Sequence, residues 1–185
     1  QADLGFLCGP AAVPASVRSD GGFELLGLAP LFDDARYHGK PTCFCDLVVR
    51  QDCTAMGLQD LHSTIFGFND TNSLSGWLGL AFALSKQQTN INGFFGSVIH
   101  TGGHLHSLNA IREGSIDVAS IDSNVLRTHR GMLNGLKVID SVGPWPSQPV
   151  VIRRTVEQKI KSQISDALKE CGPWPDLGFV GFRQQ

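Results

Sequence analysis

The sequence predicts an α/β fold with a largely parallel sheet, and three observations support this prediction. Short apolar strands alternate with helical segments along the chain, which is typical of α/β proteins. The turns that follow several strands are rich in glycine, hydroxyl and amide side chains. Residues 155–171 form an amphipathic pattern, with Val156, Ile160, Ile164 and Leu168 at steps of four. These features favour helices packed on a sheet.

The predicted elements follow from β-branched and apolar runs, from helical spacing and from their Gly or Pro ends. The predicted strands cover residues 4–8, 23–30, 42–50, 63–68, 116–121, 136–140 and 150–153, with a strand or extended tail at 177–182. The predicted helical segments cover residues 57–61, 77–84, 105–113, 125–129 and 155–171. Residues 33–41 and the proline-rich residues 143–149 are expected to be loops or crossing segments.

The composition excludes several classes of protein. The 185 residues carry a formal net charge of −2, which argues against binding nucleic acid or an anionic membrane through bulk charge. No run of eighteen apolar residues occurs, and the first residues have no basic region typical of a signal peptide. We therefore expect a soluble chain without direct membrane insertion. The five cysteines form no paired C-x-x-C spacing, so several are expected to be buried thiols.

Three turns between a strand and a helix share a polar character. In a parallel sheet the carboxyl ends of the strands lie at one edge, so these turns can meet in one crevice. Helix N-termini with hydroxyl groups suit an oxyanion, although Ser, Asn and Asp at such positions are also ordinary helix caps. The residues concerned are Asn72, Ser73 and Ser75; Thr101, Gly102 and His104; and Asp122 and Ser123.

The same three turns carry a family resemblance. The blocks are Asp70-x-x-Ser73-x-Ser75-Gly76, Gly103-His104-x-x-Ser107-x-x-Ala110-Ile111 and Gly114-x-x-Asp117-Val118-Ala119-x-Ile121-Asp122-Ser123. In order and spacing they resemble the phosphonate-binding proteins, a family of ABC-transporter solute receptors with the type II periplasmic-binding-protein fold. The resemblance covers nearly the whole chain, from about Asp3 to about Cys171.

The resemblance implies a fold of two lobes with mostly parallel sheets. Residues 42–143 would form the second lobe, and residues 1–41 with 144–185 would form the remainder of the first lobe. The family begins with roughly two further strand-helix units ahead of the position of Asp3. The first lobe is therefore expected to be incomplete in this chain, as a fragment, as a reduced relative or as a lobe completed by another chain.

The resemblance also implies the roles of site residues. Ser73, Leu74 and Ser75 would hold the oxyanion, where Leu74 replaces the middle residue of the family's Ser-Thr-Ser. His104 would reach the oxyanion with its ring, and Asp122 would bind the other end of the ligand. The remaining predicted ligand-binding residues are Asn72 and Ser123 at the strand ends, Gly9 in the Gly-Pro turn of the first lobe, and Phe44 or Cys43, where family members often carry a tyrosine.

The predicted function is that of a receptor for a small anionic or zwitterionic solute, such as a phosphonate or phosphate. Neither a cofactor nor catalysis is expected. The resemblance implies ABC-transporter membrane subunits as partners and a periplasmic or extracellular location, whereas the sequence alone leaves a cytoplasmic location open.

Two alternatives remain open at the level of sequence. One is an enzyme on the same fold, with His104 and Asp122 as base and orienting residue, since Cys43-Phe44-Cys45 weakly resembles the cysteine-rich signature of thiamine-pyrimidine synthases. The other is a metal site at His100, His104 and His106, because neutral imidazoles at such spacing can bind zinc.

Overall fold

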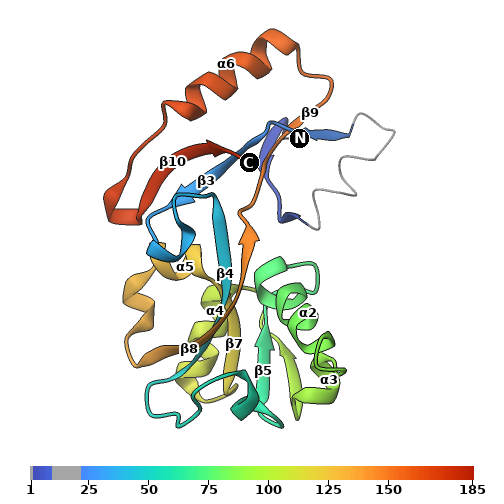
Figure 1. The fold of residues 1–185 in the computed structure, drawn as a ribbon, viewed down its shortest axis with the longest axis vertical. Coiled ribbons are helices and arrows are strands. Elements are labelled where there is room, and N and C mark those ends of the chain that lie inside the picture. Colours follow the sequence, from blue (N-terminus) through green and yellow to red (C-terminus); the bar gives the residue numbers. More distant parts are fainter. Residues whose placement is uncertain (1, 10–21) are drawn as a thin grey trace. The chain divides into compact units, whose positions relative to one another are not determined.

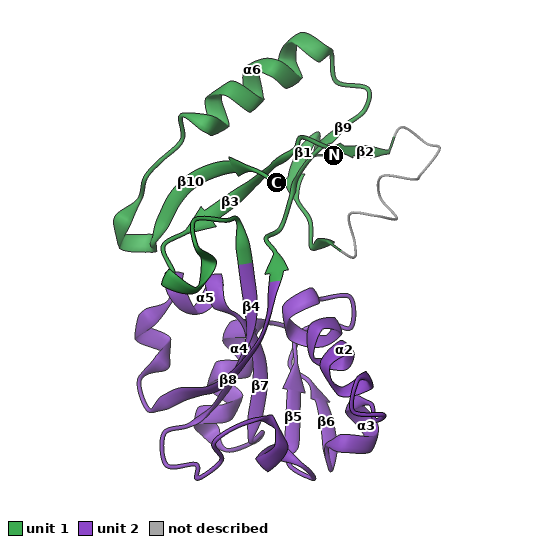
Figure 2. Ribbon diagram, viewed as in Figure 1, with its two compact units in different colours: residues 1–42, 145–185 green, residues 43–144 purple. Residues whose placement is uncertain are grey.

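The computed structural model describes residues 2–9 and 22–185 of the chain (Figure 1). The chain divides into two compact units (Figure 2). Unit 1 comprises Gln1–Thr42 and Trp145–Gln185, and unit 2 comprises Cys43–Pro144. The correspondence of these units to the two lobes of a receptor stays a prediction. No helix among the described residues is both long and apolar enough to span a membrane.

The centre of unit 2 is a five-stranded mixed sheet with the strand order β6-β5-β7-β4-β8. Strand β5 pairs in parallel with both β6 and β7, whereas β4 runs antiparallel to β7. The predicted α/β class with parallel strands at the centre is confirmed. The strands are β4 (Thr42–Arg50), β5 (Ile65–Phe68), β6 (Ser97–His100), β7 (Val118–Asp122) and β8 (Leu136–Pro146).

Helices cover both faces of this sheet, so unit 2 has three layers. Alternating side chains of β4 enter two different hydrophobic clusters. Leu47 and Val49 belong to the first cluster, and Val48 belongs to the second. The first cluster contains α2 and α3, and the second contains α4 and α5. The helical segments are η2 (Leu58–Leu61), η3 (Leu74–Leu78, a π-helix), α2 (Gly79–Ser85), α3 (Ile91–Phe94), α4 (His104–Glu113), α5 (Ser123–Thr128) and η4 (Arg130–Leu133).

Unit 1 contains two small sheets, one with the strand order β1-β9-β2 and one pairing β10 with β3. All of these described pairs are antiparallel, so the prediction of a mostly parallel sheet does not hold for this unit. Helix α6 follows β9, but the strand after it pairs with β3 instead of returning beside β9. The elements are β1 (Leu4–Phe6), β2 (Phe23–Leu25), β3 (Leu28–Phe32), η1 (Ala35–Tyr37), β9 (Val150–Arg153), α6 (Gln158–Lys169), η5 (Pro175–Leu177) and β10 (Phe179–Gln184).

The single strand predicted at residues 23–30 was wrong, because the segment forms β2 and β3 in different sheets. The break occurs at Gly27, whose φ of +71° lies in the left-handed region that glycine adopts at little cost. The helix predicted at residues 77–84 begins earlier, as the π-helix η3 that continues into α2.

Candidate functional site

The three polar turns of unit 2 lie at one edge of its sheet. Strands β5, β6 and β7 are mutually parallel, so their carboxyl ends at Phe68, His100 and Asp122 point the same way. Thr101, just after β6, donates a hydrogen bond from its hydroxyl to the carbonyl of Phe68 over 2.9 Å. The convergence expected from the sequence is therefore observed within this unit.

The segment Ser73–Leu74–Ser75 begins the helix that follows β5. The Ser73 hydroxyl caps this helix by accepting a hydrogen bond from the Gly76 amide over 3.0 Å. The Ser75 hydroxyl lies 3.2 Å from Nε2 of His104. Leu74 offers no hydroxyl, and its carbonyl accepts a hydrogen bond from the Cys45 thiol with an Sγ–O distance of 3.7 Å. Both serines are buried, so their hydroxyls form a fixed polar wall.

His104 is the first residue of α4, and its partner is on a different helix. Gly103 caps α4 and has no side chain that could bond the first N–H groups of this ten-residue helix. Burial lowers the pKa of His104 to about 4, so its ring is neutral near pH 7. Among the described residues Nδ1 of His104 is buried without a hydrogen-bond partner, an arrangement that a polar ligand could complete.

Asp122 ends β7 and caps α5, where its carboxylate accepts a hydrogen bond from the Asn124 amide over 2.8 Å. Burial raises the pKa of Asp122 to about 6. The hydrogen bonds from the Asn124 amide and the Ser75 hydroxyl lower this pKa. The nearby charge of Asp46 raises it, and a hydrogen bond from Cys43 lowers it. The Ser75 hydroxyl thus contacts both His104 and Asp122.

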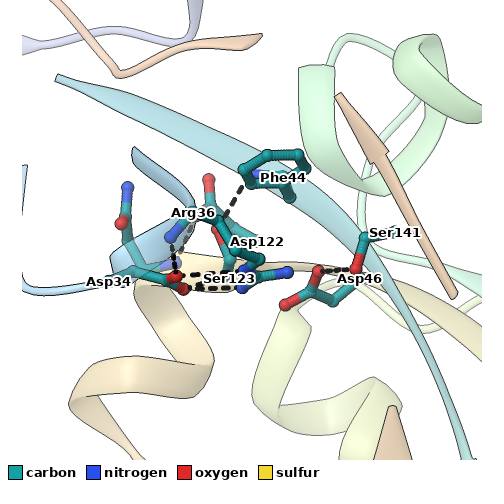
Figure 3. A network of polar contacts seen from close by, with 8 residues as sticks. Asp34, Arg36, Phe44, Asp46, Asp122, Ser123 and Ser141 are labelled. Atoms are coloured by element: carbon teal, nitrogen blue, oxygen red, sulfur yellow. Dashed lines mark hydrogen bonds and ion pairs between the residues drawn. The ribbon is translucent and has the colours of Figure 1, made fainter. Parts of the chain in front are cut away.

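Ser123 and Phe44 connect β7 to β4 beside this cluster. The Ser123 hydroxyl accepts a hydrogen bond from the Phe44 amide over 2.8 Å (Figure 3). Close by, the Ser141 hydroxyl donates to the buried carboxylate of Asp46 over 2.7 Å (Figure 3). These contacts fix the backbone at the end of the sheet.

Two predicted site residues are not joined to the cluster. Asn72 is exposed, and its amide donates a hydrogen bond to the Asp70 carboxylate over 2.6 Å. Gly9 lies in unit 1 and is half-buried. Their roles in binding stay predictions.

The three histidines of the alternative metal site do not come together. His100 contacts the carbonyl of Asn69 through Nε2 over 2.9 Å, whereas His104 faces Ser75. The ring of His106 lies beside its own turn at Gly103. Within residues 2–9 and 22–185, no group of three possible metal ligands comes together. The His-x3-His-x-His spacing places these rings on different partners because the turn and the first turn of α4 direct them apart.

Three residues support Ser75 and Asp122; sequence reasoning missed Ser120 and Cys45 and named Cys43 only as an alternative to Phe44. The Ser120 hydroxyl donates to the carbonyl of Ser75, and the thiols of Cys43 and Cys45 bond to Asp122 and to the carbonyl of Leu74. All five cysteines are free thiols, and Cys43 and Cys45 are buried, as expected for several of the five. A serine within the apolar strand 118–122 was the available signal for Ser120.

The cluster lacks the usual arrangement of a catalytic triad. Ser75 and His104 are close enough for a nucleophile and a base, but the carboxylate of Asp122 contacts the serine. Among the described residues, none orients the imidazole through Nδ1. The pairing of His104 as base with Asp122 as orienting residue, which the enzyme alternative expects, is thus not among the contacts of the described residues.

Gly76 lies next to the polar wall, where there is no room for a side chain. The variant Gly76→Ala is therefore expected to lower the free energy of unfolding by about 1–3 kcal/mol. An added Cβ would lie 1.7 Å from Oδ1 of Asn69 and 3.2 Å from the Ser73 hydroxyl. Urea denaturation measures the effect. Gly131→Ala is the matched control, because an added Cβ there meets nothing within 4 Å. Equal stability of the two variants would contradict this account of Gly76.

Comparisons with known proteins agree with this arrangement of an α/β fold and a polar strand edge. The sequence model of the family described as the periplasmic substrate-binding protein of a phosphonate ABC transporter matches residues 1–177. The phosphonates-binding periplasmic protein of Escherichia coli (strain K12) is 26% identical over 160 residues, which cover 78% of this chain and 47% of that protein. The chain thus spans about half the length of this curated relative.

Solved structures show the same fold. A binding protein component of an ABC phosphonate transporter from Pseudomonas aeruginosa matches with a TM-score of 0.79 at 22% identity, covering 100% of this chain and 64% of that one. PhnD1 from Prochlorococcus marinus (MIT 9301), solved in complex with methylphosphonate, matches with a TM-score of 0.73 at 15% identity, covering 90% of this chain and 64% of that one.

These findings place the chain in the class of solute receptors of ABC transporters. More specifically, the chain belongs to the family of phosphonate-binding periplasmic substrate-binding proteins. Its relatives are binding proteins and are periplasmic.

Proposed function

We propose that this chain binds a small oxyanion, such as a phosphonate or phosphate, as part of a solute receptor for an ABC-type transporter. The observation that carries the proposal is the Ser75 hydroxyl, which lies 3.2 Å from Nε2 of His104 and also bonds to Asp122. Asp122 ends a parallel strand, and Ser75 and His104 lie in the helices that follow two others, at the sheet edge where ligands bind in open α/β sheets.

The proposed oxyanion contacts are the Ser75 hydroxyl, the ring of His104 and the N–H groups at the start of α4. Helix N-termini favour negative charge, and this one has no side-chain cap to compete with a ligand. On binding, the Ser75 hydroxyl would turn its proton from Asp122 to the ligand, while its oxygen accepts a hydrogen bond from Nε2–H of His104. In this neutral ring Nδ1 is an acceptor, so its missing partner would be a protonated oxygen of the ligand.

Asp122 would bind the opposite end of the ligand. Its carboxylate can accept a hydrogen bond from an amine, a hydroxyl or a protonated oxygen. Ser73, Leu74, Asn72, Ser123, Phe44 and Gly9 are proposed as further ligand contacts on the basis of the family resemblance. Leu74 would contribute an apolar contact in place of a third hydroxyl, which suits a ligand carrying a carbon substituent.

The proposal extends to partners and location. As a member of this family the chain would deliver its solute to the membrane subunits of an ABC transporter, in the periplasm. Binding would involve two lobes that close around the solute, as the family resemblance implies.

Calorimetric titration of the chain with methylphosphonate tests the proposed function. We expect saturable binding, competition by inorganic phosphate and no heat of binding with tert-butanol, which has a similar size and tetrahedral shape but no oxyanion. Absence of binding by methylphosphonate and by phosphate would contradict the proposal for this chain.

A further inference from the structure

The Ser75 hydroxyl contacts both His104 and Asp122 but has a single proton to donate. Its oxygen lies 3.2 Å from Nε2 of His104, and it also forms a hydrogen bond with the carboxylate of Asp122. An ionised carboxylate can only accept, so Ser75 donates its proton to Asp122. The neutral ring of His104 then donates from Nε2–H to the serine oxygen. In the protein without ligand, both hydrogen bonds therefore point toward Asp122.

A bound oxyanion would take this hydrogen bond away from Asp122. The oxyanion is also an acceptor, and the proposed function gives it the proton of Ser75. Asp122 would keep the hydrogen bonds from the Asn124 amide, over 2.8 Å, and from Cys43. The loss of one donor leaves a buried carboxylate less stabilised in its charged form and favours its protonation.

The groups around Asp122 also disfavour a further negative charge. Asp122 is 6% exposed, and Asp46 on the neighbouring strand β4 is 2% exposed (Figure 3). In the described ranges, the charge that shifts the pKa of Asp122 is the one on Asp46, and it raises this pKa. An oxyanion beside Ser75 would add another negative charge with the same effect. The titratable neighbours are Asp46 and Cys43 of β4 and His104 of α4, which reaches Asp122 through Ser75 of η3.

We infer that Asp122 takes up one proton from the solvent when an oxyanion without a cationic group binds beside Ser75. The proton forms an O–H bond on the carboxyl of Asp122, and this O–H donates to the second lone pair of the Ser75 oxygen. Ser75 then accepts from His104 and from Asp122 and donates to the ligand. This uptake rests on the proposed function, because it requires an oxyanion at Ser75. The receptor thus binds a simple phosphonate together with a proton.

The uptake weakens binding as the pH rises above the pKa of Asp122. This pKa is about 6 in the free protein. At pH 5 the carboxyl is therefore mostly protonated before the ligand arrives, whereas at pH 7.5 about 3% of it is. Because the protonated fraction alone matches the bound state, the affinity at pH 7.5 is about 30-fold lower than that of a site that is always neutral. His104, with a pKa of about 4, stays neutral at both pH values.

Calorimetric titration with methylphosphonate at pH 5 and at pH 7.5 tests the uptake by comparing the unmodified chain with Asp122→Asn. Asparagine resembles the protonated carboxyl, since its amide can donate to Ser75 and its oxygen can accept from the Asn124 amide. We expect the affinity of the variant, divided by that of the unmodified chain, to rise about 30-fold from pH 5 to pH 7.5. The ligand's own titration affects both proteins alike and cancels in this ratio.

The matched control is Asp117→Asn. It makes the same substitution at an exposed residue just before β7, where the carboxylate accepts a hydrogen bond from the Ile65 amide over 2.8 Å. Its affinity relative to the unmodified chain is expected to change less than about twofold between the two pH values. A change of less than about threefold for Asp122→Asn would overturn the proposal, because Asp122 would then keep its charge in the complex.

Proton uptake is also measured directly, as the acid needed to hold pH 7.5 when methylphosphonate at that pH is added. We expect the unmodified chain to take up about one proton more per bound ligand than Asp122→Asn. Equal uptake by the two proteins, with binding retained, would overturn the protonation of Asp122 and leave the proposed function standing. Absence of binding by both proteins at both pH values would contradict the proposed function itself, and the uptake with it.

Discussion

The double variant Ser75→Ala, His104→Ala is expected to lose roughly 10²–10⁴-fold in affinity for methylphosphonate, because Ser75 is proposed to donate one hydrogen bond to the oxyanion and His104 to accept one from its protonated oxygen. A hydrogen bond to a charged group contributes about 1.5–3 kcal/mol, so two contribute about 3–6 kcal/mol. Calorimetric titration against the unmodified chain measures the loss. The fold should persist, since both side chains lie at the edge of the sheet and outside its hydrophobic clusters.

The matched control is His62→Ala, Ser63→Ala in the same unit. There the Ser63 hydroxyl lies 2.8 Å from Nδ1 of His62, so the control also removes a hydrogen-bonded serine and histidine. Both control residues are exposed and follow η2, before the start of β5. The control is expected to bind methylphosphonate within about twofold of the unmodified chain. An equal loss in both double variants would remove Ser75 and His104 from the proposed anion site.

The fold was predictable where local pattern decides it. Residues 42–50 and 150–153 were assigned as strands to the residue, because apolar and β-branched runs end there at charged or turn residues. The end of α4 was also predictable, since Gly114 adopts a φ of +77° after the last helical residue. Such signals need no information from distant parts of the chain.

Features that depend on distant segments were not predictable. The break at Gly27 lies within a continuous apolar run, and the run alone does not reveal that β2 and β3 belong to different sheets. The antiparallel pairing of β1, β2 and β9 likewise depends on which strands meet after a long return of the chain. Sequence spacing carries little information about such non-local pairing.

In the candidate site, too, some features were predictable from sequence and others depend on distant segments. Ser75, His104 and Asp122 could be brought together from sequence because parallel strands end at one edge. The supporting thiols could not, since alternating Cys43 and Cys45 resemble ordinary core residues. Their contacts follow from the register that places Cys45 opposite Asp122, and this register is a property of the β4–β7 pair.

The pH dependence of stability is expected to reveal the buried carboxyl of Asp122. Its pKa is about 6 in the folded protein and about 3.8 in the unfolded chain. The folded state therefore holds the proton more tightly, and the free energy of unfolding falls as pH rises from about 4 through 6. One unit of pKa corresponds to about 1.4 kcal/mol, so the loss is about 3 kcal/mol by pH 7.5.

Asp122→Asn is expected to remove this loss, since asparagine resembles the protonated carboxyl and keeps an acceptor for the Asn124 amide. Urea denaturation gives the free energy of unfolding of the variant and of the unmodified chain at pH 4 and at pH 7.5. The difference between the two proteins is expected to change by about 3 kcal/mol between these pH values. Because burial is the main cause of the raised pKa and the charge of Asp46 a minor one, the change should persist when both proteins also carry Asp46→Asn. Parallel pH profiles for both proteins would contradict the raised pKa, and a change abolished by Asp46→Asn would assign it to charge repulsion between the two carboxylates.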